Sequence, residues 1–225
     1  YEALLRWPHA EQGMLRPASF MDAMVDAGLC STMSDWALDQ IAANRPAADA
    51  VVSINLSARL LHDEEFSRRL FERIDQGRPS AQQLILEITE DTHEADLKAA
   101  IPVLLELKAR GVRIALDDFG TGQASLSHLR RFAFDYIKID QSFVTGIGSV
   151  PSDEKLIQAV VRLAHALGMK VVAEGVENEA QASTLVQKLQ ALHRGKAGPF
   201  DVVFGCCTNA AGFAKLQNAD IPLPL

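Results

Sequence analysis

The sequence predicts an α/β fold and, within that class, a (β/α)₈ barrel. Short apolar runs rich in Val, Ile and Leu alternate with helix-length amphipathic segments about seven times along the chain. Its 225 residues come close to the roughly 250 that are typical of such a barrel. Several of the runs also end in acidic or amide residues. An open doubly wound sheet gives the same alternation, and periodicity alone does not separate the two architectures.

Seven apolar runs are the candidate strands, because they are short and rich in branched aliphatic side chains, as buried parallel strands are. A closed barrel of this type has eight. Since the chain opens on Tyr1 and Glu2 with almost no lead-in, we expect a first strand upstream of residue 1. The candidate strands are residues 3–7, 51–56, 84–88, 112–116, 136–139, 170–173 and 201–204.

Helices are expected between these runs, most clearly at residues 93–110 and 152–167. Each closes on a glycine, Gly111 or Gly168, which is the common residue just beyond a helix C-terminus. The second begins with a serine and two acidic residues, a pattern that favours a helix N-terminus. Residues 178–181 resemble a capping box and predict the start of a later helix.

Composition favours one globular domain over residues 1–225, with 48% hydrophobic and 23% charged residues and a mean hydropathy near zero. A formal net charge of −7 disfavours binding to duplex nucleic acid, which needs an excess of basic residues. No apolar stretch reaches membrane-spanning length, and the N-terminus lacks the order of a signal peptide. We therefore expect a cytoplasmic domain without a membrane segment.

Metal sites built from cysteine or histidine are disfavoured. The three cysteines, Cys30, Cys206 and Cys207, form no CxxC pair, and their odd number argues against a disulfide framework. The six histidines show no HExxH or comparable ligand spacing. A bound cation would therefore be held mainly by oxygen atoms.

Polar side chains gather at the ends of the candidate strands. In a parallel barrel the carboxyl ends of all strands open on one face, so residues far apart in the sequence meet there. We expect an acidic, oxygen-rich site on that face. The residues at these ends are Asn55, Glu87, Glu90, Asp117, Asp118, Lys138, Asp140, Glu174 and Glu177.

So many carboxylates do not stay ionised together at close range unless cations neutralise them. Oxygen ligands suit hard ions, Mg²⁺ or Mn²⁺ before Zn²⁺. Two such ions about 3.5–4 Å apart stabilise both the attacking and the leaving oxygen in phosphodiester hydrolysis. Simpler roles exist for single residues: Asn55 as a helix cap, Lys138 as a solvated lysine or a partner of Asp140, and the DFGTG sequence as an ordinary turn.

Six short motifs follow one another along the chain. They are Glu2-Ala3-Leu4-Leu5-Arg6-Trp7, Asn55-Leu56-Ser57, Glu87-Ile88-Thr89-Glu90, Asp117-Asp118-Phe119-Gly120-Thr121-Gly122, Lys138-Ile139-Asp140 and Ala173-Glu174-Gly175-Val176-Glu177. They resemble the signature motifs of bacterial EAL domains and occur in the order of that family. The resemblance covers roughly residues 1–190 and is weak after about residue 192. One such motif alone is weak evidence, whereas six in order are specific.

This resemblance implies a barrel with one antiparallel strand that hydrolyses the bacterial second messenger cyclic di-GMP to linear 5′-pGpG. It implies two metal ions, Mg²⁺ or Mn²⁺, with Ca²⁺ binding but inhibiting. One ion would be held by Glu2, Asn55, Glu87 and Asp117, and the other by Asp117, Asp118 and Glu174.

The resemblance also implies roles for residues around the metals. Lys138 would position or help to deprotonate the attacking water, with Glu177 supporting that site and Glu174 counted among the catalytic residues. Arg6 would contact a phosphate of the ligand. The substrate-binding set is completed by Leu4 and Asp140.

Partners follow from the same resemblance. Residues 118–127 resemble a loop that couples metal binding to dimer contacts, so a homodimer is expected. A sensory or GGDEF domain is expected in the full-length protein. Such a protein could be anchored to a membrane even though this domain has no membrane segment.

The chain departs from the family in three places. Phe204 stands where the family carries a glutamine of the active site, and an aromatic ring does not replace the hydrogen bonds of an amide. Residues 193–225 fit the family poorly, and the loop reads Gly122-Gln123-Ala124-Ser125 where an aromatic residue commonly follows the glycine.

Three functions therefore compete. The first and favoured one is an active two-metal phosphodiesterase, because the ligand residues and Lys138 are all present. The second is a non-catalytic cyclic di-GMP receptor that signals through a protein partner. The third, an unrelated barrel enzyme with a single metal, is disfavoured by the ordered motifs.

Overall fold

The computed structural model describes residues 1–44, 47, 49–120, 129, 132, 134–146, 151–176 and 202–205. The chain divides into two compact units. The first comprises Tyr1–Ile88 and Thr92–Ile114, and the second comprises Thr89–Asp91 and Ala115–Leu225. Each unit is a parallel sheet with helices, and strand β6 (Arg113–Phe119) begins in the first unit and ends in the second.

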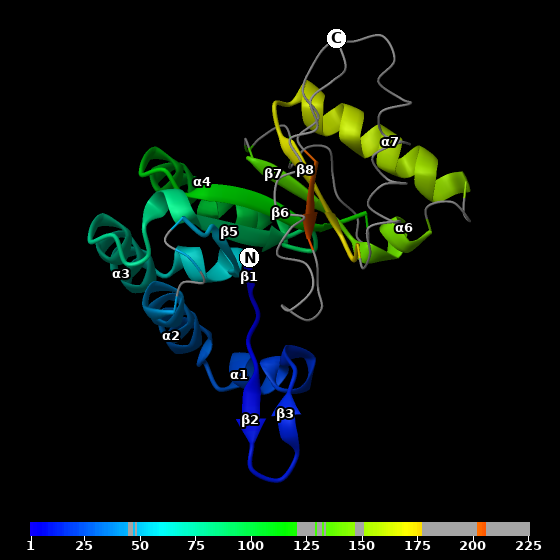
Figure 1. Ribbon diagram of the computed structural model, residues 1–225. Helices are drawn as coiled ribbons and strands as arrows, with labels where there is room; N and C mark the ends of the chain where they lie inside the picture. Colours follow the sequence, from blue (N-terminus) through cyan, green and yellow to red (C-terminus); the bar gives the residue numbers. More distant parts are fainter. Residues whose placement is uncertain are drawn as a thin grey trace. The chain divides into compact units, whose positions relative to one another are not determined.

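The sheet of the first unit has the order β1-β4-β5, with all its pairs parallel. Its strands are β1 (Glu2–Ala3), β4 (Val52–Asn55) and β5 (Leu84–Thr89) (Figure 1). In the register Glu2 lies opposite Ser53, and Asn55 opposite Glu87. Because the pairs are parallel, the carboxyl ends of the three strands share one edge of the sheet, where Asn55 ends β4 beside Glu87 of β5.

The helices of the first unit cover this sheet with apolar side chains. Helix α3 begins at Asp63, whose carboxylate accepts hydrogen bonds from the backbone of Glu65 and Phe66 at 2.9 and 3.1 Å. The helices are η1 (Pro17–Ser19), α1 (Met21–Asp26), α2 (Cys30–Ala43), η2 (Ala58–His62), α3 (Glu64–Asp75), η3 (Ala81–Gln83) and α4 (Glu94–Ala109). Fully buried in this core are Phe66, Leu70, Leu84, Leu86, Ile88, Leu104 and Leu107.

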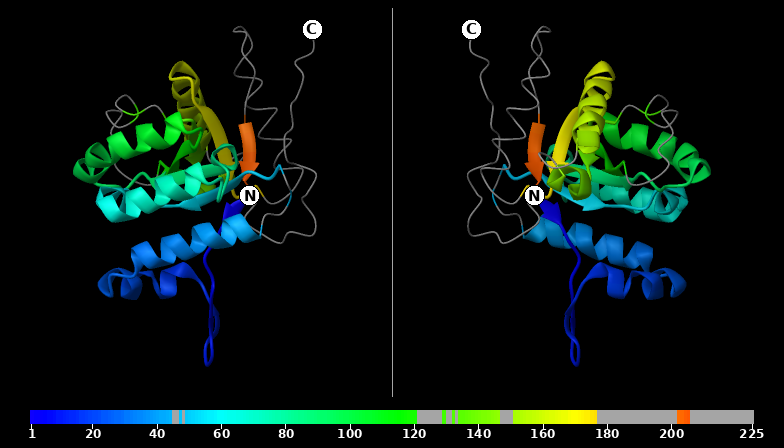
Figure 2. Two further views of the ribbon diagram at one scale, coloured as in Figure 1. Left: turned by 90° about the vertical axis from the view of Figure 1, so that its left-hand side faces the viewer. Right: turned by 90° about the vertical axis from the view of Figure 1, so that its right-hand side faces the viewer.

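Helix α2 lies beside α3 and is joined to it by ion pairs (Figures 1 and 2). The guanidinium of Arg69 lies 2.9 Å from the carboxylate of Asp35 and donates a hydrogen bond to Ser31 at 2.8 Å. One turn further along α3, Arg73 contacts both Asp35 and Asp39. The arginines of α3 therefore hold the outer helix α2 in place.

The expected strand at residues 3–7 is wrong, because this stretch belongs to two different elements. Only Glu2 and Ala3 pair with β4, whereas Trp7 starts β2 (Trp7–His9), which forms an antiparallel hairpin with β3 (Gly13–Leu15). The Trp7 ring packs edge-on against Phe20, with ring centroids 5.8 Å apart. An apolar run does not reveal that its two halves pair with different partners.

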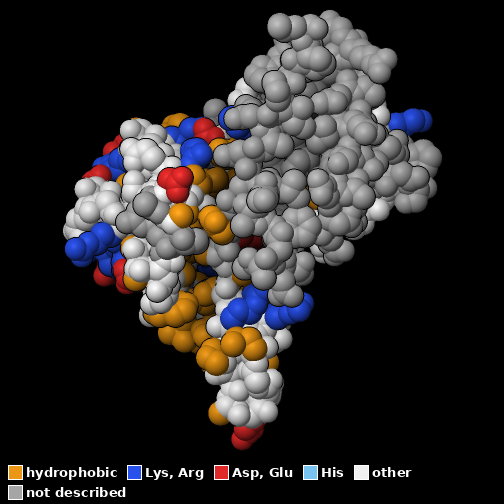
Figure 3. Space-filling model, viewed as in Figure 1, with side chains coloured by type: hydrophobic (Ala, Val, Ile, Leu, Met, Phe, Trp, Pro, Cys, Tyr) orange, Lys and Arg blue, Asp and Glu red, His pale blue; other side chains and the backbone are white. Residues whose placement is uncertain are grey.

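Apolar side chains gather on the surface over the hairpin and the helices that follow it (Figure 3). The exposed fraction is 42% for Trp7, 64% for Met14 and 53% for Trp36. Val25 and Leu29 are also exposed. This part of the first unit is therefore less completely packed than the core between α3, α4 and β5.

The sheet of the second unit has the order β6-β7-β8-β9, again with parallel pairs. After β6 come β7 (Tyr136–Ile139), β8 (Lys170–Glu174) and β9 (Val202–Gly205). The short helix α6 (Gln141–Thr145) and the longer α7 (Pro151–Ala166) lie between β7 and β8 in the sequence and contact both the sheet and each other (Figure 1).

Most other predicted elements are confirmed within one to three residues at their ends. The helix expected at 93–110 is α4, and the one expected at 152–167 is α7. The helix start expected at 178–181 lies outside the described residues. Every described pair within the two sheets is parallel, and the antiparallel strand implied by the resemblance is not among the described strands of these sheets.

Among the helices that the structure describes, none combines the length and the apolar character needed to cross a membrane.

Candidate metal centre

Asp117 and Asp118 lie in a β-bulge near the end of β6. The pairing with β7 runs from Leu116 opposite Ile137 to Phe119 opposite Ile139, so three steps along β6 match two along β7. Asp118 has φ 56°, a left-handed conformation that aspartate tolerates better than most residues. The bulge breaks the alternation that would send neighbouring side chains to opposite faces of a regular strand.

The bulge brings both aspartates close to Glu174, the last residue of β8. One carboxylate oxygen from each of Asp117, Asp118 and Glu174 lies within 4.8 Å of the other two. Asp117 is buried, Glu174 is half-buried and Asp118 is exposed. The three carboxylates therefore form one cluster that reaches from the protein interior to solvent.

Lys138 enters this cluster from β7, the strand between β6 and β8. Its Nζ lies 2.9 Å from Asp117 Oδ1 and 2.7 Å from Glu174 Oε1, and its side chain is only 7% exposed. Three carboxylates against one ammonium group leave an excess of two negative charges, which is the charge that one divalent cation neutralises. The donors are all carboxylate oxygens, so the cluster fits a hard ion such as Mg²⁺ or Mn²⁺.

The surroundings of Asp118 raise the pKa of its carboxyl group. Partial loss of hydration raises the pKa of its carboxyl group, and the negative charges of Asp117 and Asp140 raise it further. Lys138 acts in the opposite direction without cancelling these effects. The side chain reaches solvent, yet the surrounding protein removes enough water to disfavour its charged form.

A second group of predicted ligands lies together in the first unit. Glu2 and Glu87 each offer a carboxylate oxygen within 4.8 Å of the other, and Glu87 is only 2% exposed. Asn55 donates from Nδ2 to Glu2 Oε1 at 3.4 Å. The alternative that Asn55 caps the next helix is wrong, because Ser57 takes that position and accepts a hydrogen bond from Arg59.

Glu90 has a defined contact that the sequence did not assign. Its side chain is buried, and its Oε2 accepts a hydrogen bond from the backbone N–H of Gly120 at 2.6 Å. Its own N–H donates to the carbonyl oxygen of Asp117 at 2.9 Å. Glu90 therefore holds the turn that contains both aspartates. Two features of the sequence could have indicated this contact. Glu90 is a second acidic residue after Glu87 at the end of one strand, and the glycine-rich turn after the next strand has backbone N–H groups that need acceptors.

The predicted substrate-binding residues lie in two places. Leu4 and Arg6 are exposed in the segment between β1 and β2, and Arg6 donates to the carbonyl of Leu5 at 2.7 Å. Asp140 caps α6 by accepting a hydrogen bond from Ser142 N at 2.9 Å. Its carboxylate is therefore engaged in holding α6, and a contact with a substrate stays a prediction.

The remaining predictions concern the second half of the chain. Glu177 lies outside the described residues, as do residues 121–127 of the predicted dimer loop and nearly all of 193–225. Phe204 is part of β9, where it lies opposite Ala173 and next to the pair formed by Glu174 and Gly205. The backbone of Phe204 thus lies on the strand adjacent to the one that carries Glu174, and its match to the family's glutamine stays a prediction.

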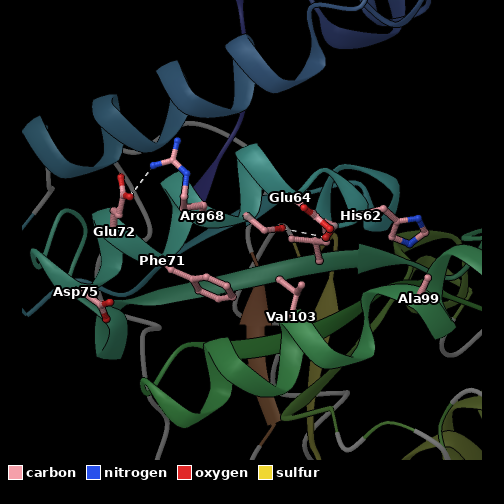
Figure 4. A pocket seen from close by; sticks show the side chains of 10 residues that line it. His62, Glu64, Arg68, Phe71, Glu72, Asp75, Ala99 and Val103 are labelled. Carbon is pink, nitrogen blue, oxygen red and sulfur yellow. Dashed lines mark hydrogen bonds and ion pairs between the residues drawn. The ribbon is translucent and has the colours of Figure 1, made fainter.

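A cavity of about 600 Å³ lies elsewhere in the first unit, among η2, α3 and α4. Phe71 and Val103 line it, as do Arg68 and Glu72, which form an ion pair at 2.6 Å (Figure 4). None of the predicted metal ligands or substrate-binding residues lines this cavity. The candidate metal centre is therefore defined by the strand ends rather than by this cavity.

Comparison with known proteins identifies the family. The model of the EAL domain family matches residues 1–190. The chain belongs to the EAL domain family. This EAL chain is 39% identical over 209 residues to an uncharacterized signaling protein of Caulobacter vibrioides, covering 90% of this chain and 26% of that protein.

Two further relatives of this EAL domain come from Pseudomonas aeruginosa. One is the bifunctional diguanylate cyclase/cyclic di-GMP phosphodiesterase MucR, 34% identical over 83% of this chain and 28% of that protein. The other is the cyclic di-GMP phosphodiesterase NbdA, also 34% identical, over 82% of this chain and 24% of that protein. The chain thus spans about a quarter of the length of the curated relatives named here.

Solved structures confirm the fold class of this EAL domain. A structure described as PaMucR phosphodiesterase in complex with c-di-GMP matches with a TM-score of 0.74 and 34% identity, covering 83% of this chain and 78% of that one. An EAL domain protein from Listeria monocytogenes matches with a TM-score of 0.71 and 31% identity, covering 83% and 75%. The resemblance inferred from the six motifs is therefore confirmed.

Proposed function

We propose that this EAL domain hydrolyses cyclic di-GMP to linear 5′-pGpG. The observation that carries the proposal is the cluster of Asp117, Asp118 and Glu174 around the buried ammonium of Lys138. Its support from comparison is that MucR and NbdA, which the chain resembles, are named cyclic di-GMP phosphodiesterases. Water adds to one phosphorus, the bond from phosphorus to the ribose 3′ oxygen breaks, and the released 3′ oxygen takes a proton.

The residues of the two groups fit hard divalent ions. In this proposal Asp117, Asp118 and Glu174 hold one ion of Mg²⁺ or Mn²⁺, and the other is held by Glu2, Asn55 and Glu87 together with Asp117. Bound ions of this kind lower the pKa of water and neutralise charge on the phosphate in the transition state. The support is that all these donors are carboxylate or amide oxygens and that the cluster in the second unit has two negative charges in excess.

The protein supplies the remaining positioning and charge. Lys138 is fixed by Asp117 and Glu174, so we assign it to orienting the attacking water and helping to remove its proton. Arg6, with its guanidinium at the surface, binds a phosphate of the substrate. Leu4, Asp140 and Glu177 keep the supporting roles that the family resemblance gives them.

Separating linear from cyclic dinucleotide by chromatography tests the proposal. The purified chain should produce 5′-pGpG with Mg²⁺ or Mn²⁺ and none after chelation with EDTA. Asp117→Asn removes one anionic ligand oxygen and should abolish turnover while the circular dichroism spectrum stays unchanged. Asp153→Asn, which changes an acid on α7 outside the cluster, is the matched control and should retain full turnover. Full turnover by Asp117→Asn would overturn the site assignment.

Phe204 favours a second candidate function, a cyclic di-GMP receptor without catalysis. Phe204 lies on β9 opposite Ala173, next to the pair of Glu174 and Gly205. The family resemblance implies a glutamine of the active site at this position. If the wild-type chain binds cyclic di-GMP in calorimetry but forms no product, and Phe204→Gln gains hydrolysis, the receptor function is correct. Hydrolysis by the wild-type chain excludes it. A homodimer and a regulatory GGDEF or sensory domain belong to the same proposal for the full-length protein.

A further inference from the structure

Helix α6 contacts the backbone beside two of the three carboxylates in the second unit. It starts three residues after Lys138, and Asp140 caps it. Its first residue, Gln141, approaches Gly175, and its third residue, Phe143, approaches Gly120. Gly120 follows the Asp117-Asp118 bulge, and Gly175 follows Glu174 directly. One short helix therefore touches the chain just after both ligand-bearing strands.

The contact with Gly120 leaves no room for a side chain. Gly120 has φ 105°, and a Cβ at this position would lie 2.8 Å from the ring of Phe143. The N–H of Gly120 is at the same time bound to Glu90 at 2.6 Å. The backbone two residues after Asp118 is thus held by a hydrogen bond from Glu90 and by van der Waals contact with Phe143.

The contact with Gly175 involves the backbone of α6 itself. Gly175 has φ 71°, and a Cβ here would overlap the Cβ of Gln141 and lie 3.2 Å from its Cα. A flexible side chain can move aside, whereas a Cα at a helix start moves only with the helix. The distance between α6 and the residue after Glu174 is therefore fixed by the lack of a side chain at Gly175.

We propose that α6 is a positioning element of the metal centre: Phe143 acts through Gly120 on Asp118, and Gln141 acts through Gly175 on Glu174. The helix thereby sets the separation of two carboxylates that come from different strands. This inference rests on the proposed function only in assigning Asp117, Asp118 and Glu174 to a divalent ion. Groups that orient metal ligands in this way typically change metal affinity by about 10–100-fold when altered.

Titration of the whole chain with Mn²⁺ alone, followed by electron paramagnetic resonance, tests the role of Phe143. Phe143→Ala removes the ring and should weaken Mn²⁺ binding by about 10–100-fold. Phe143→Leu keeps much of the contact and should lose less affinity than Phe143→Ala. Unchanged Mn²⁺ affinity in Phe143→Ala, with only a lower melting temperature, would show a purely structural role and overturn the proposal.

Gly175 has a matched control in Gly168. Both glycines have left-handed backbones, φ 71° and 74°, but a Cβ at Gly168 would meet no atom within 4 Å. Gly175→Ala should weaken Mn²⁺ binding by about 10–100-fold, whereas Gly168→Ala should lower the melting temperature without changing that affinity. Adding Gln141→Gly to Gly175→Ala removes the overlapping Cβ and should restore part of the loss. Equal effects of the two single variants would contradict the proposal.

Mn²⁺ binding and hydrolysis fail separately, so the two proposals are distinguishable. A wild-type chain that binds Mn²⁺ but forms no 5′-pGpG, together with α6 variants that bind weakly, supports the positioning role and refutes the proposed function. A wild-type chain that hydrolyses cyclic di-GMP, together with α6 variants of normal Mn²⁺ affinity, supports the proposed function and refutes the positioning role of α6. A wild-type chain that binds no Mn²⁺ refutes both.

Discussion

At the scale of single residues, the candidate centre is an arrangement of charges that balances only in part. Burying Lys138 removes its ammonium from water, and the carboxylates of Asp117 and Glu174 offset that cost with two close ion pairs. Asp118 adds a further negative charge, and its pKa is raised first by partial loss of hydration and then by the charges of Asp117 and Asp140. The same residues that make the cluster electrostatically unfavourable make it a good binding site for a divalent ion.

Replacing Lys138 should separate catalysis from metal binding. In Lys138→Met the three carboxylates lose their internal cation, so Mn²⁺ affinity should stay the same or increase. Turnover of cyclic di-GMP should fall by about 10²–10³-fold, the usual cost of losing one group that acts in the transition state. Calorimetric titration with Mn²⁺ and product analysis measure the two effects. Weaker Mn²⁺ binding with unchanged turnover would place Lys138 outside the catalytic set.

Removing the charge of Asp118 should stabilise the metal-free protein. The pKa of Asp118 is raised in the folded state. Between the pKa of the unfolded chain and that of the folded protein, only the folded protein keeps the proton, so its free energy of unfolding falls as the pH rises between these two values. Asp118→Asn should therefore increase the free energy of unfolding at pH 7 in EDTA. The difference from wild type should vanish below about pH 4, where the carboxyl of the unfolded chain is also protonated.

Saturating Mg²⁺ provides the control for Asp118→Asn, because the metal stabilises wild type through a negatively charged carboxylate that the variant lacks. Under that condition wild type should be the more stable protein in urea unfolding. A variant that is less stable than wild type in EDTA at pH 7 would show that Asp118 is not destabilised by its surroundings.

The residues of the centre were largely predictable from the sequence, but their contacts were not. Parallel strands bring their carboxyl ends together, which is sufficient to predict that Asp117, Lys138 and Glu174 meet. The choice of partners depends on the bulge in β6 and on the cap of α6. Asp140, the alternative partner of Lys138, instead accepts hydrogen bonds from Ser142, and no pattern in the sequence distinguishes these outcomes.

At the scale of elements, the sequence predicts long, regular segments well and short ones poorly. Runs of branched aliphatic residues identify β4 to β9 because buried parallel strands are apolar on both faces. The hairpin of β2 and β3 was missed, since its strands are three residues each and lack alternation. Helix α6, with five residues, was also missed, because a single turn carries almost no periodic signal.

Helix α3 offers a test of one element without touching the site. Asp63 accepts hydrogen bonds from two N–H groups at the start of the helix, and Asp63→Ala should lower the free energy of unfolding by about 1 kcal/mol. Asp63→Asn keeps an acceptor and should cost much less. Both are measured by urea unfolding. Mn²⁺ affinity should match wild type in both variants, and a loss of affinity would link α3 to the metal centre.

At the scale of the whole molecule, the predicted ligands are divided between the two compact units. Glu2, Asn55 and Glu87 belong to the first, and Asp117, Asp118 and Glu174 to the second. The strand ends that carry Asn55, Glu87, Asp117, Asp118 and Glu174 were identified from the repeated strand and helix pattern, whereas Glu2 was implied only by the family resemblance. The order of the strands along each sheet follows the order along the chain, which is what right-handed crossover connections in a barrel produce.

Calcium should separate metal binding from catalysis for the molecule as a whole. Ca²⁺ accepts the same carboxylate oxygens as Mg²⁺, so either ion should raise the melting temperature of the chain, by mass action on the folded state. At a concentration about 100 times the dissociation constant, this stabilisation amounts to about 2.7 kcal/mol.

Ca²⁺ takes six to eight ligands at about 2.3–2.6 Å, whereas Mg²⁺ holds a tighter octahedron at about 2.0–2.1 Å. The looser shell should not position water and phosphate closely enough for attack, because misplacement by about 1 Å costs about 10²-fold in rate. We therefore expect Ca²⁺ to stabilise the protein, to compete with Mg²⁺ and to suppress formation of 5′-pGpG. Thermal unfolding and product analysis in the same buffers measure both effects. Rapid hydrolysis with Ca²⁺ alone would show that the tightness of the ligand shell around the metal does not control the reaction.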